Sequence, residues 1–121
     1  MNKNRILSFK YAGAGILTAL QDEPNLKIHF FIAVLTIFAG FYFGISTIEW
    51  LILFLSIGGV ISLELTNTAI EEVVNTFTQE HHPSAKKAKD VAAGAVLIAS
   101  IFALMIGVVI FLPYINNSFL K

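Results

Sequence analysis

The chain has 121 residues, of which 56% are hydrophobic and 13% are charged. A soluble domain carries charge on roughly a quarter of its residues, so water is not the solvent for most of this chain. The formal net charge is zero, which excludes the strong basic field of a nucleic-acid-binding protein. Cysteine is absent, which excludes disulfides, thiolate metal sites and a cysteine nucleophile.

The N-terminal segment predicts a helix that lies on a membrane surface. Over residues 5–22, apolar side chains such as Ile6, Phe9 and Leu17 recur at near-helical spacing, but too few follow one another to cross a bilayer. A cleavable signal peptide needs a basic start, a short apolar core and a small-residue cleavage site, and residues 1–27 do not supply this combination, because charged residues are scattered through their helical pattern. We therefore expect this segment to remain in the mature protein.

Three later segments are apolar enough to cross a bilayer, which takes about 20 residues of helix. They cover about residues 28–46, 48–74 and 88–112. Pro83 breaks the polar connection before the third segment, and Pro113 is expected to close that segment. The predicted fold is therefore all-α and integral to the membrane, with three transmembrane helices plus an N-terminal amphipathic surface helix, in a single domain over residues 1–121.

The distribution of lysine and arginine predicts the orientation, because cytoplasmic flanks of membrane spans are enriched in these residues. Residues 1–27 contain four of them and residues 86–89 contain three, whereas the connection between the first two spans contains none. We expect the N-terminus and the second loop in the cytoplasm, where ATP is available, and the C-terminus outside.

The most informative polar residues lie towards the cytoplasmic end of the second span. Spacings of three, four and seven residues put Glu64, Asn67, Thr68 and Glu71 on one face of a helix, away from Glu72. Carboxylate and amide oxygens suit Mg²⁺, and a carboxylate is a candidate general base. Acidic residues within a membrane span are functional by default, so Glu64 carries the strongest indication of chemistry.

Structural explanations compete for the other polar residues of the chain. A solvated helix end explains Glu71 equally well, and hydrogen bonds between helices are the more common role of an isolated asparagine such as Asn67. Glu23, just before the first span, fits a helix cap. His29 shows no metal-binding arrangement and is interpreted as a residue of the membrane interface.

A second polar motif, Lys86-Lys87-Ala88-Lys89-Asp90, precedes the third span. Ammonium groups there can neutralise the phosphates of ATP. Anchoring of a cytoplasmic loop explains Lys86 and Lys87 equally well, but it explains Lys89 beside Asp90 less well. The sequence has no Walker loop and no kinase-type glycine-rich loop, so a nucleotide would need a different binding site.

Together these motifs resemble the small prokaryotic diacylglycerol kinase family, which includes the undecaprenol kinases of Gram-positive bacteria. Residues 64–71 match the family pattern E-x-x-N-[ST]-A-[IL]-E, and 88–90 and 94–96 follow at the matching distance. The resemblance runs from about Phe9 to Leu112. It implies a kinase that transfers the γ-phosphate of MgATP to the hydroxyl of a membrane lipid alcohol.

Within that family, residues 67–75 look more like the Gram-positive members, which favours undecaprenol over diacylglycerol as the substrate. The resemblance also implies a homotrimer in the bacterial plasma membrane, with active sites shared between neighbouring chains. Arg5 lies about one residue out of register with the family's N-terminal arginine, and no role is carried over to it.

The resemblance further implies roles for individual residues. Glu64 would be the catalytic base that receives the proton of the lipid hydroxyl, and Glu23 and Glu71 would be Mg²⁺ ligands. The residues implied at the nucleotide are Tyr11, Glu23, Asn67, Glu71, Glu80, His81, His82, Lys89 and Asp90. The residues implied at the lipid are Glu64, Ala12 and Gly13.

Two functions of other classes remain open from the sequence. A small oligomeric proton-coupled transporter would use Glu64 as its coupling residue, but it would leave Glu23, Lys89 and Asp90 without a function. A purely structural membrane scaffold would leave all of the acidic residues unexplained.

Overall fold

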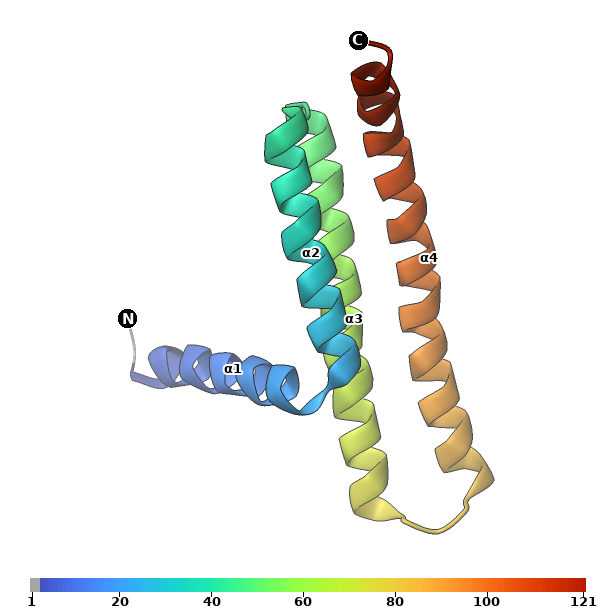
Figure 1. Cartoon of the computed structure of the whole chain (residues 1–121). Coiled ribbons are helices and arrows are strands. Elements are labelled where there is room, and N and C mark those ends of the chain that lie inside the picture. The colour runs from blue at the N-terminus through green and yellow to red at the C-terminus, as the bar shows by residue number, and fades with distance from the viewer. Residues whose placement is uncertain (1–2) are drawn as a thin grey trace.

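The computed structural model describes residues 3–121, with the exposure of side chains from Asn4 onwards. It contains four helices: α1 (Lys3–Asp22), α2 (Pro24–Phe43), α3 (Thr47–Phe77) and α4 (Pro83–Phe119) (Figure 1). No strand occurs within the described residues. By length and composition, α2, α3 and α4 could each cross a membrane. The predicted all-α class, with three spans after an N-terminal helix, is confirmed.

The three long helices run up and down beside one another, and α1 leaves them sideways at the beginning of α2 (Figure 1). Helix α3 is central: it packs most extensively against α4 and also contacts α2 and α1. The direction of α1, across the long helices, is that of a helix lying on a membrane surface. The beginning of α2, the end of α3 and the beginning of α4 therefore lie on the same side of the molecule as α1.

Local sequence explains where the helices begin and end. Pro24 and Pro83 each stand in the first turn of a helix, where the missing N–H is not needed. Helix α2 ends at Gly44, whose φ of 63° is a left-handed conformation that favours glycine. Helix α3 begins with a capping box, in which Ser46 and Glu49 each accept a hydrogen bond from the backbone N–H of the other.

The prediction that Pro113 closes the third span is wrong, because α4 continues through it to Phe119. A proline inside a helix removes one backbone hydrogen bond and crowds the preceding turn. The turn after Pro113 has an anchor on another helix, since the Tyr114 hydroxyl donates a hydrogen bond to Glu49 Oε2 at 2.6 Å. We infer that this contact offsets the proline.

Side chains at the Glu49 end of the long helices form the main buried cluster. Ile45, Leu53 and Ile110 are its buried members, and Trp50 and Tyr114 are among the partly buried residues packed against them. Most other large apolar side chains of the described residues point outward, as the exposed fractions of 50–77% at α3 residues Phe54 and Leu55 illustrate. Lipid chains or neighbouring copies of the chain are the natural cover for such a surface.

The Tyr114–Glu49 contact yields a stability prediction. Tyr114→Phe keeps the ring but leaves Glu49 without its hydroxyl donor, so we expect the free energy of unfolding to fall measurably. Tyr42→Phe is the matched control, because Tyr42 lies at the same end and is 83% exposed; its effect should stay within about 0.5 kcal/mol. Denaturant unfolding in detergent micelles measures both, and equal effects would contradict the role assigned to Tyr114.

Candidate active site

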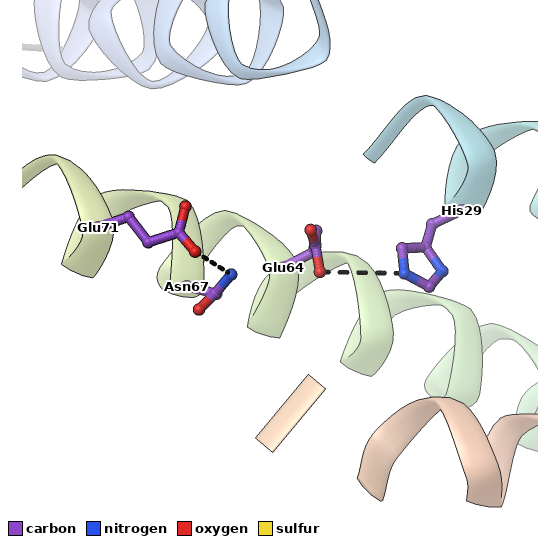
Figure 2. A network of polar contacts seen from close by, with 4 residues as sticks. All are labelled: His29, Glu64, Asn67 and Glu71. Atoms are coloured by element: carbon purple, nitrogen blue, oxygen red, sulfur yellow. Dashed lines mark hydrogen bonds and ion pairs between the residues drawn. The ribbon is translucent and has the colours of Figure 1, made fainter. Parts of the chain in front are cut away.

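Glu64 is the most deeply buried charged side chain of the described residues, with only 3% of its surface exposed. Its carboxylate faces His29 of α2, whose Nε2 lies 3.9 Å from Glu64 Oε2 (Figure 2). The negatively charged neighbours of Glu64 are Glu23, at the corner between α1 and α2, and Glu71 on its own helix. A buried carboxylate is costly unless it finds a partner, and the imidazole is the nearest one that this chain provides.

Asn67 and Glu71 continue from Glu64 along the same side of α3 (Figure 2). The Asn67 Nδ2 donates a hydrogen bond to Glu71 Oε1 at 3.4 Å. The helical spacing of the sequence predicts this arrangement. The other end of the Asn67 amide, Oδ1, is buried and has no hydrogen-bond partner among the described residues. A buried acceptor of this kind is available to a donor or a cation.

A groove runs between α1 and α3, beside this row of polar side chains. Its lining includes Ala12 and Glu23 from the sequence-predicted site and Thr68 and Glu72 of α3. Thr68, expected on the face of Glu64, is thus directed towards α1, together with Glu72. The structure therefore brings Glu72 to the same groove as Glu23, a neighbourhood that helical spacing on α3 alone does not reveal.

Two other residues predicted on α1 are less enclosed. Tyr11 is 68% exposed, and Gly13 is also exposed, with no atom within 4 Å of the position that a β-carbon would take. Tyr11 makes no side-chain hydrogen bond to the row at Glu64 within the described residues, and Gly13 has no side chain that could make one. The structure places them on the membrane-surface helix, but a single chain does not bring them to Glu64.

A cavity of about 240 Å³ lies between α2, α3 and α4, inside the predicted membrane region. Its lining is largely apolar, with a few polar side chains, and residues that represent the three helices are His29, Thr36, Ser56, Val60, Ser100 and Leu104. Val60 is one helical turn from Glu64. His29 therefore belongs both to the lining of the cavity and to the surroundings of Glu64.

Lys89 is held by α3 rather than by an acidic partner. Its Nζ donates a hydrogen bond to Asn75 Oδ1 at 2.8 Å. Asp90 instead forms an ion pair with Lys86, one turn earlier on α4. The negative charge of Asp90 is thus offset within its own helix, while the contact that holds Lys89 is neutral and leaves the positive charge of Lys89 available to an anion.

The loop residues predicted at the nucleotide lie at the connection from α3 to α4 and are exposed. The Glu80 backbone N–H bonds Thr78 Oγ1, and His82 Nδ1 accepts the backbone N–H of Ser84 at 3.2 Å, which caps α4. His81 lines a shallow surface hollow that also includes Asp90. The structure therefore brings His81 near Asp90 and gives His82 a structural role as a cap.

The donors expected for Mg²⁺ fit that ion in kind, although one chain does not assemble a complete site. Glu23 and Glu71 supply carboxylate oxygens, and the buried Asn67 Oδ1 supplies an unpartnered amide oxygen. Within residues 3–121, however, no three histidine, aspartate or glutamate side chains converge as a metal-binding group. Further ligands would come from ATP, water or another chain.

Sequence reasoning assigned His29 only to the membrane interface and assigned no role to Asn75. His29 is 35 residues away from Glu64, and the two are brought together only by the packing of α2 against α3. Asn75 lies on the helical line of Glu64, Asn67 and Glu71, which is the one signal that the sequence offered. Its partner Lys89 is identified only when α4 folds back on α3.

Comparison with known proteins connects this geometry to one family. A family model described as prokaryotic diacylglycerol kinase matches residues 10–111. An undecaprenol kinase of Bacillus subtilis is 49% identical over 106 residues, which cover 88% of this chain and 86% of that protein. A diacylglycerol kinase of Synechocystis is 43% identical over 91% of this chain, which corresponds to 63% of that longer protein.

A diacylglycerol kinase of Haemophilus influenzae is 34% identical over 94 residues, which cover 78% of this chain and 80% of that protein. The family match includes both polar motifs of the chain, at residues 64–71 and 86–90, all of α2 and α3, and α4 up to residue 111. The resemblance deduced from the sequence is confirmed: the chain belongs to the prokaryotic diacylglycerol kinase family.

Proposed function

We propose that this chain is an ATP-dependent lipid kinase that phosphorylates the hydroxyl of undecaprenol. The observation that carries the proposal is the buried carboxylate of Glu64, which lies one turn from an intramembrane cavity and on the same helix face as Asn67 and Glu71. The 49% identity with a protein named undecaprenol kinase favours that lipid. The relatives named diacylglycerol kinase make diacylglycerol the second candidate.

The reaction assigned to this site is an in-line phosphoryl transfer. The lipid hydroxyl oxygen forms a bond to the γ-phosphorus, while the bond from that phosphorus to the bridging oxygen breaks and ADP leaves with the electron pair. Glu64 accepts the hydroxyl proton, as a general base within hydrogen-bonding reach can do. Such a transfer requires mainly positioning of the reactants and neutralisation of phosphate charge.

Mg²⁺ would be held by Glu23 and Glu71, and when bound it would neutralise the phosphate oxygens of ATP. Lys89 supplies positive charge from α4, and Asn75 holds its ammonium in place without cancelling that charge. Asn67 keeps Glu71 oriented through its Nδ2. We propose the nucleotide and lipid roles carried by the family resemblance for the remaining site residues, which are Tyr11, Ala12, Gly13, Glu80, His81, His82 and Asp90.

We also propose that the working enzyme is a homotrimer in the bacterial plasma membrane, with the N-terminus and the site on the cytoplasmic side. Two observations support an assembly: the predicted metal ligands do not form a complete group within the described residues, and many large apolar side chains are exposed. The lysines of residues 86–89 stand on the same side as α1, which agrees with the positive-inside rule.

Transfer of labelled phosphate from ATP to a panel of lipids tests the kinase directly. Wild-type protein in micelles should phosphorylate undecaprenol more efficiently than diacylglycerol. Glu64→Gln keeps the shape of the side chain but cannot accept the proton, so turnover should fall by at least about 100-fold. The variant should be as stable as the wild type or more so, because an intramembrane charge is removed.

Two outcomes of the lipid panel would contradict the proposal. Normal turnover by Glu64→Gln would remove Glu64 as the base. If well-folded wild type phosphorylated no lipid, but liposomes showed a proton-coupled flux that Glu64→Gln abolished, the chain would be a transporter instead.

The proposed metal ligands can be tested on adjacent residues of α3. Glu71→Ala should raise the Mg²⁺ concentration required for half-maximal activity at least about tenfold, or abolish activity, because a carboxylate ligand is lost. Glu72→Ala should have a milder effect, since Glu72 is not bonded to Asn67. Activity measured as a function of Mg²⁺ separates the two variants. Equal loss of activity in both variants would contradict Glu71 as the specific metal ligand. It would point instead to the groove between α1 and α3, which Glu72 lines.

Substitution of the α4 lysines distinguishes a lysine whose charge acts on the nucleotide from a lysine whose charge only keeps the loop in the cytoplasm. Lys89→Met preserves length and apolar bulk but removes the ammonium, so kcat should fall by at least about 100-fold. Lys87→Met should retain most activity, because two other lysines keep the loop inside. Lys86→Met should be intermediate, since Lys86 pairs with Asp90. Equal loss of activity in all three variants would contradict a specific role for Lys89.

A further inference from the structure

His29 is the one basic side chain that faces Glu64 among the described residues, and the mechanism above does not use it. The imidazole is contributed by α2, whereas the other charged neighbours, Glu23 and Glu71, are both acidic. The side chain of His29 is only 22% exposed. A partly buried histidine at this position needs an explanation other than the membrane interface, to which the sequence analysis assigned it.

The separation of His29 and Glu64 is one that a single oxygen atom can bridge from the side of the line that joins them. The 3.9 Å from Nε2 to Oε2 is too long for a direct hydrogen bond. An oxygen atom placed about 2.8 Å from each of them satisfies both distances and forms two good hydrogen bonds. Such an oxygen, if it carries a proton, would donate a hydrogen bond to Glu64 and accept a hydrogen bond from Nε2–H of His29.

The cavity supplies a route by which a lipid oxygen reaches this position. His29 lines the cavity between α2, α3 and α4, and so does Val60, one turn before Glu64 on α3. The lining is mainly apolar, as a hydrocarbon chain requires, and the His29–Glu64 pair brings an imidazole and a carboxylate together beside it. The pair therefore lies where the hydroxyl of a membrane alcohol would lie if its chain entered the cavity.

From these observations we propose that His29 and Glu64 together form the binding site for the hydroxyl of the lipid substrate. His29 donates from Nε2 to the hydroxyl oxygen, which directs the O–H bond of the alcohol towards Glu64. The remaining lone pair of that oxygen is then free to attack phosphorus. This inference rests on the proposed lipid kinase activity and adds the residue that recognises the alcohol.

If His29 recognises the alcohol, its loss affects binding of the lipid only; if His29 is only structural, its loss affects binding of both substrates. Loss of the Nε2 donor should weaken binding of the alcohol but leave ATP binding unchanged, because His29 lies on the lipid side of Glu64. A site that hydrogen-bonds a hydroxyl also discriminates against analogues that lack it. A residue that only filled space between α2 and α3 would affect both substrates, and it would not affect that discrimination.

The test compares His29→Phe, which keeps an aromatic ring without a donor, with His29→Gln, which keeps an N–H donor. His29→Phe should raise the KM for undecaprenol about tenfold or more, as expected for the loss of one buried hydrogen bond, with the KM for ATP unchanged. His29→Gln should recover most of that loss. Thr66→Val is the control, because Thr66 is exposed and its hydroxyl already donates to the Ser62 carbonyl.

A second measurement uses the hydrocarbon analogue of the lipid, which lacks the hydroxyl, as a competitive inhibitor. The wild type should favour the alcohol over this analogue, and His29→Phe should lose about tenfold of that preference. An unchanged KM for the lipid in His29→Phe, or a rise in both KM values that glutamine does not rescue, would overturn the role of His29. If the wild type forms no lipid phosphate, the proposed kinase function fails first, so the two failures are distinguishable.

Discussion

The burial of a carboxylate inside a membrane-spanning helix is the constraint on which the rest of this structure depends. An ionised acid in an apolar environment costs several kcal/mol unless other groups compensate it, and Glu64 is 3% exposed. The imidazole of His29, on the neighbouring helix α2, lies within ion-pairing distance of the Glu64 carboxylate. The packing of α2 against α3 therefore supplies a partner for this carboxylate as well as apolar contact.

The two ends of the long helices use polar contacts for different purposes. At the Glu49 end, every polar group in the contact has a short-range partner: Ser46 caps α3, and Tyr114 ties α4 to Glu49. At the opposite end, Asn67 Oδ1 has no partner among the described residues, and Lys89 is held by a neutral amide. Satisfied polar groups fix a structure, whereas available acceptors and uncompensated charge suit the binding of a ligand. The partnered polar contacts therefore lie at one end of the bundle, and the proposed site lies at the other.

The sequence predicted the features that depend on a single helix, but it did not predict the contacts between helices. The period of an α-helix was sufficient to place Asn67 and Glu71 in contact, and hydropathy was sufficient to count the spans. The continuation of α4 through Pro113 was missed because its anchor, Glu49, lies on α3. His29 was assigned to the membrane interface for the same reason, since its partner is on another helix. Contacts between helices depend on relative rotation and depth, which periodicity within one segment does not specify.

The balance of charge at the site explains why cations are needed there. Glu23, Glu64 and Glu71 lie near one another, and ATP would bring further negative charge to this acidic end of the bundle. Repulsion between such charges is strong in a medium of low dielectric constant. Lys89 is a site cation without an acidic partner of its own, and one ammonium cannot offset three carboxylates and a triphosphate. A divalent metal ion is the simplest remaining source of positive charge, and the carboxylate and amide oxygens of α3 are the ligands that such an ion prefers. On the proposed function, the acidity of this site would oppose a nucleotide alone and favour a nucleotide that carries its metal ion.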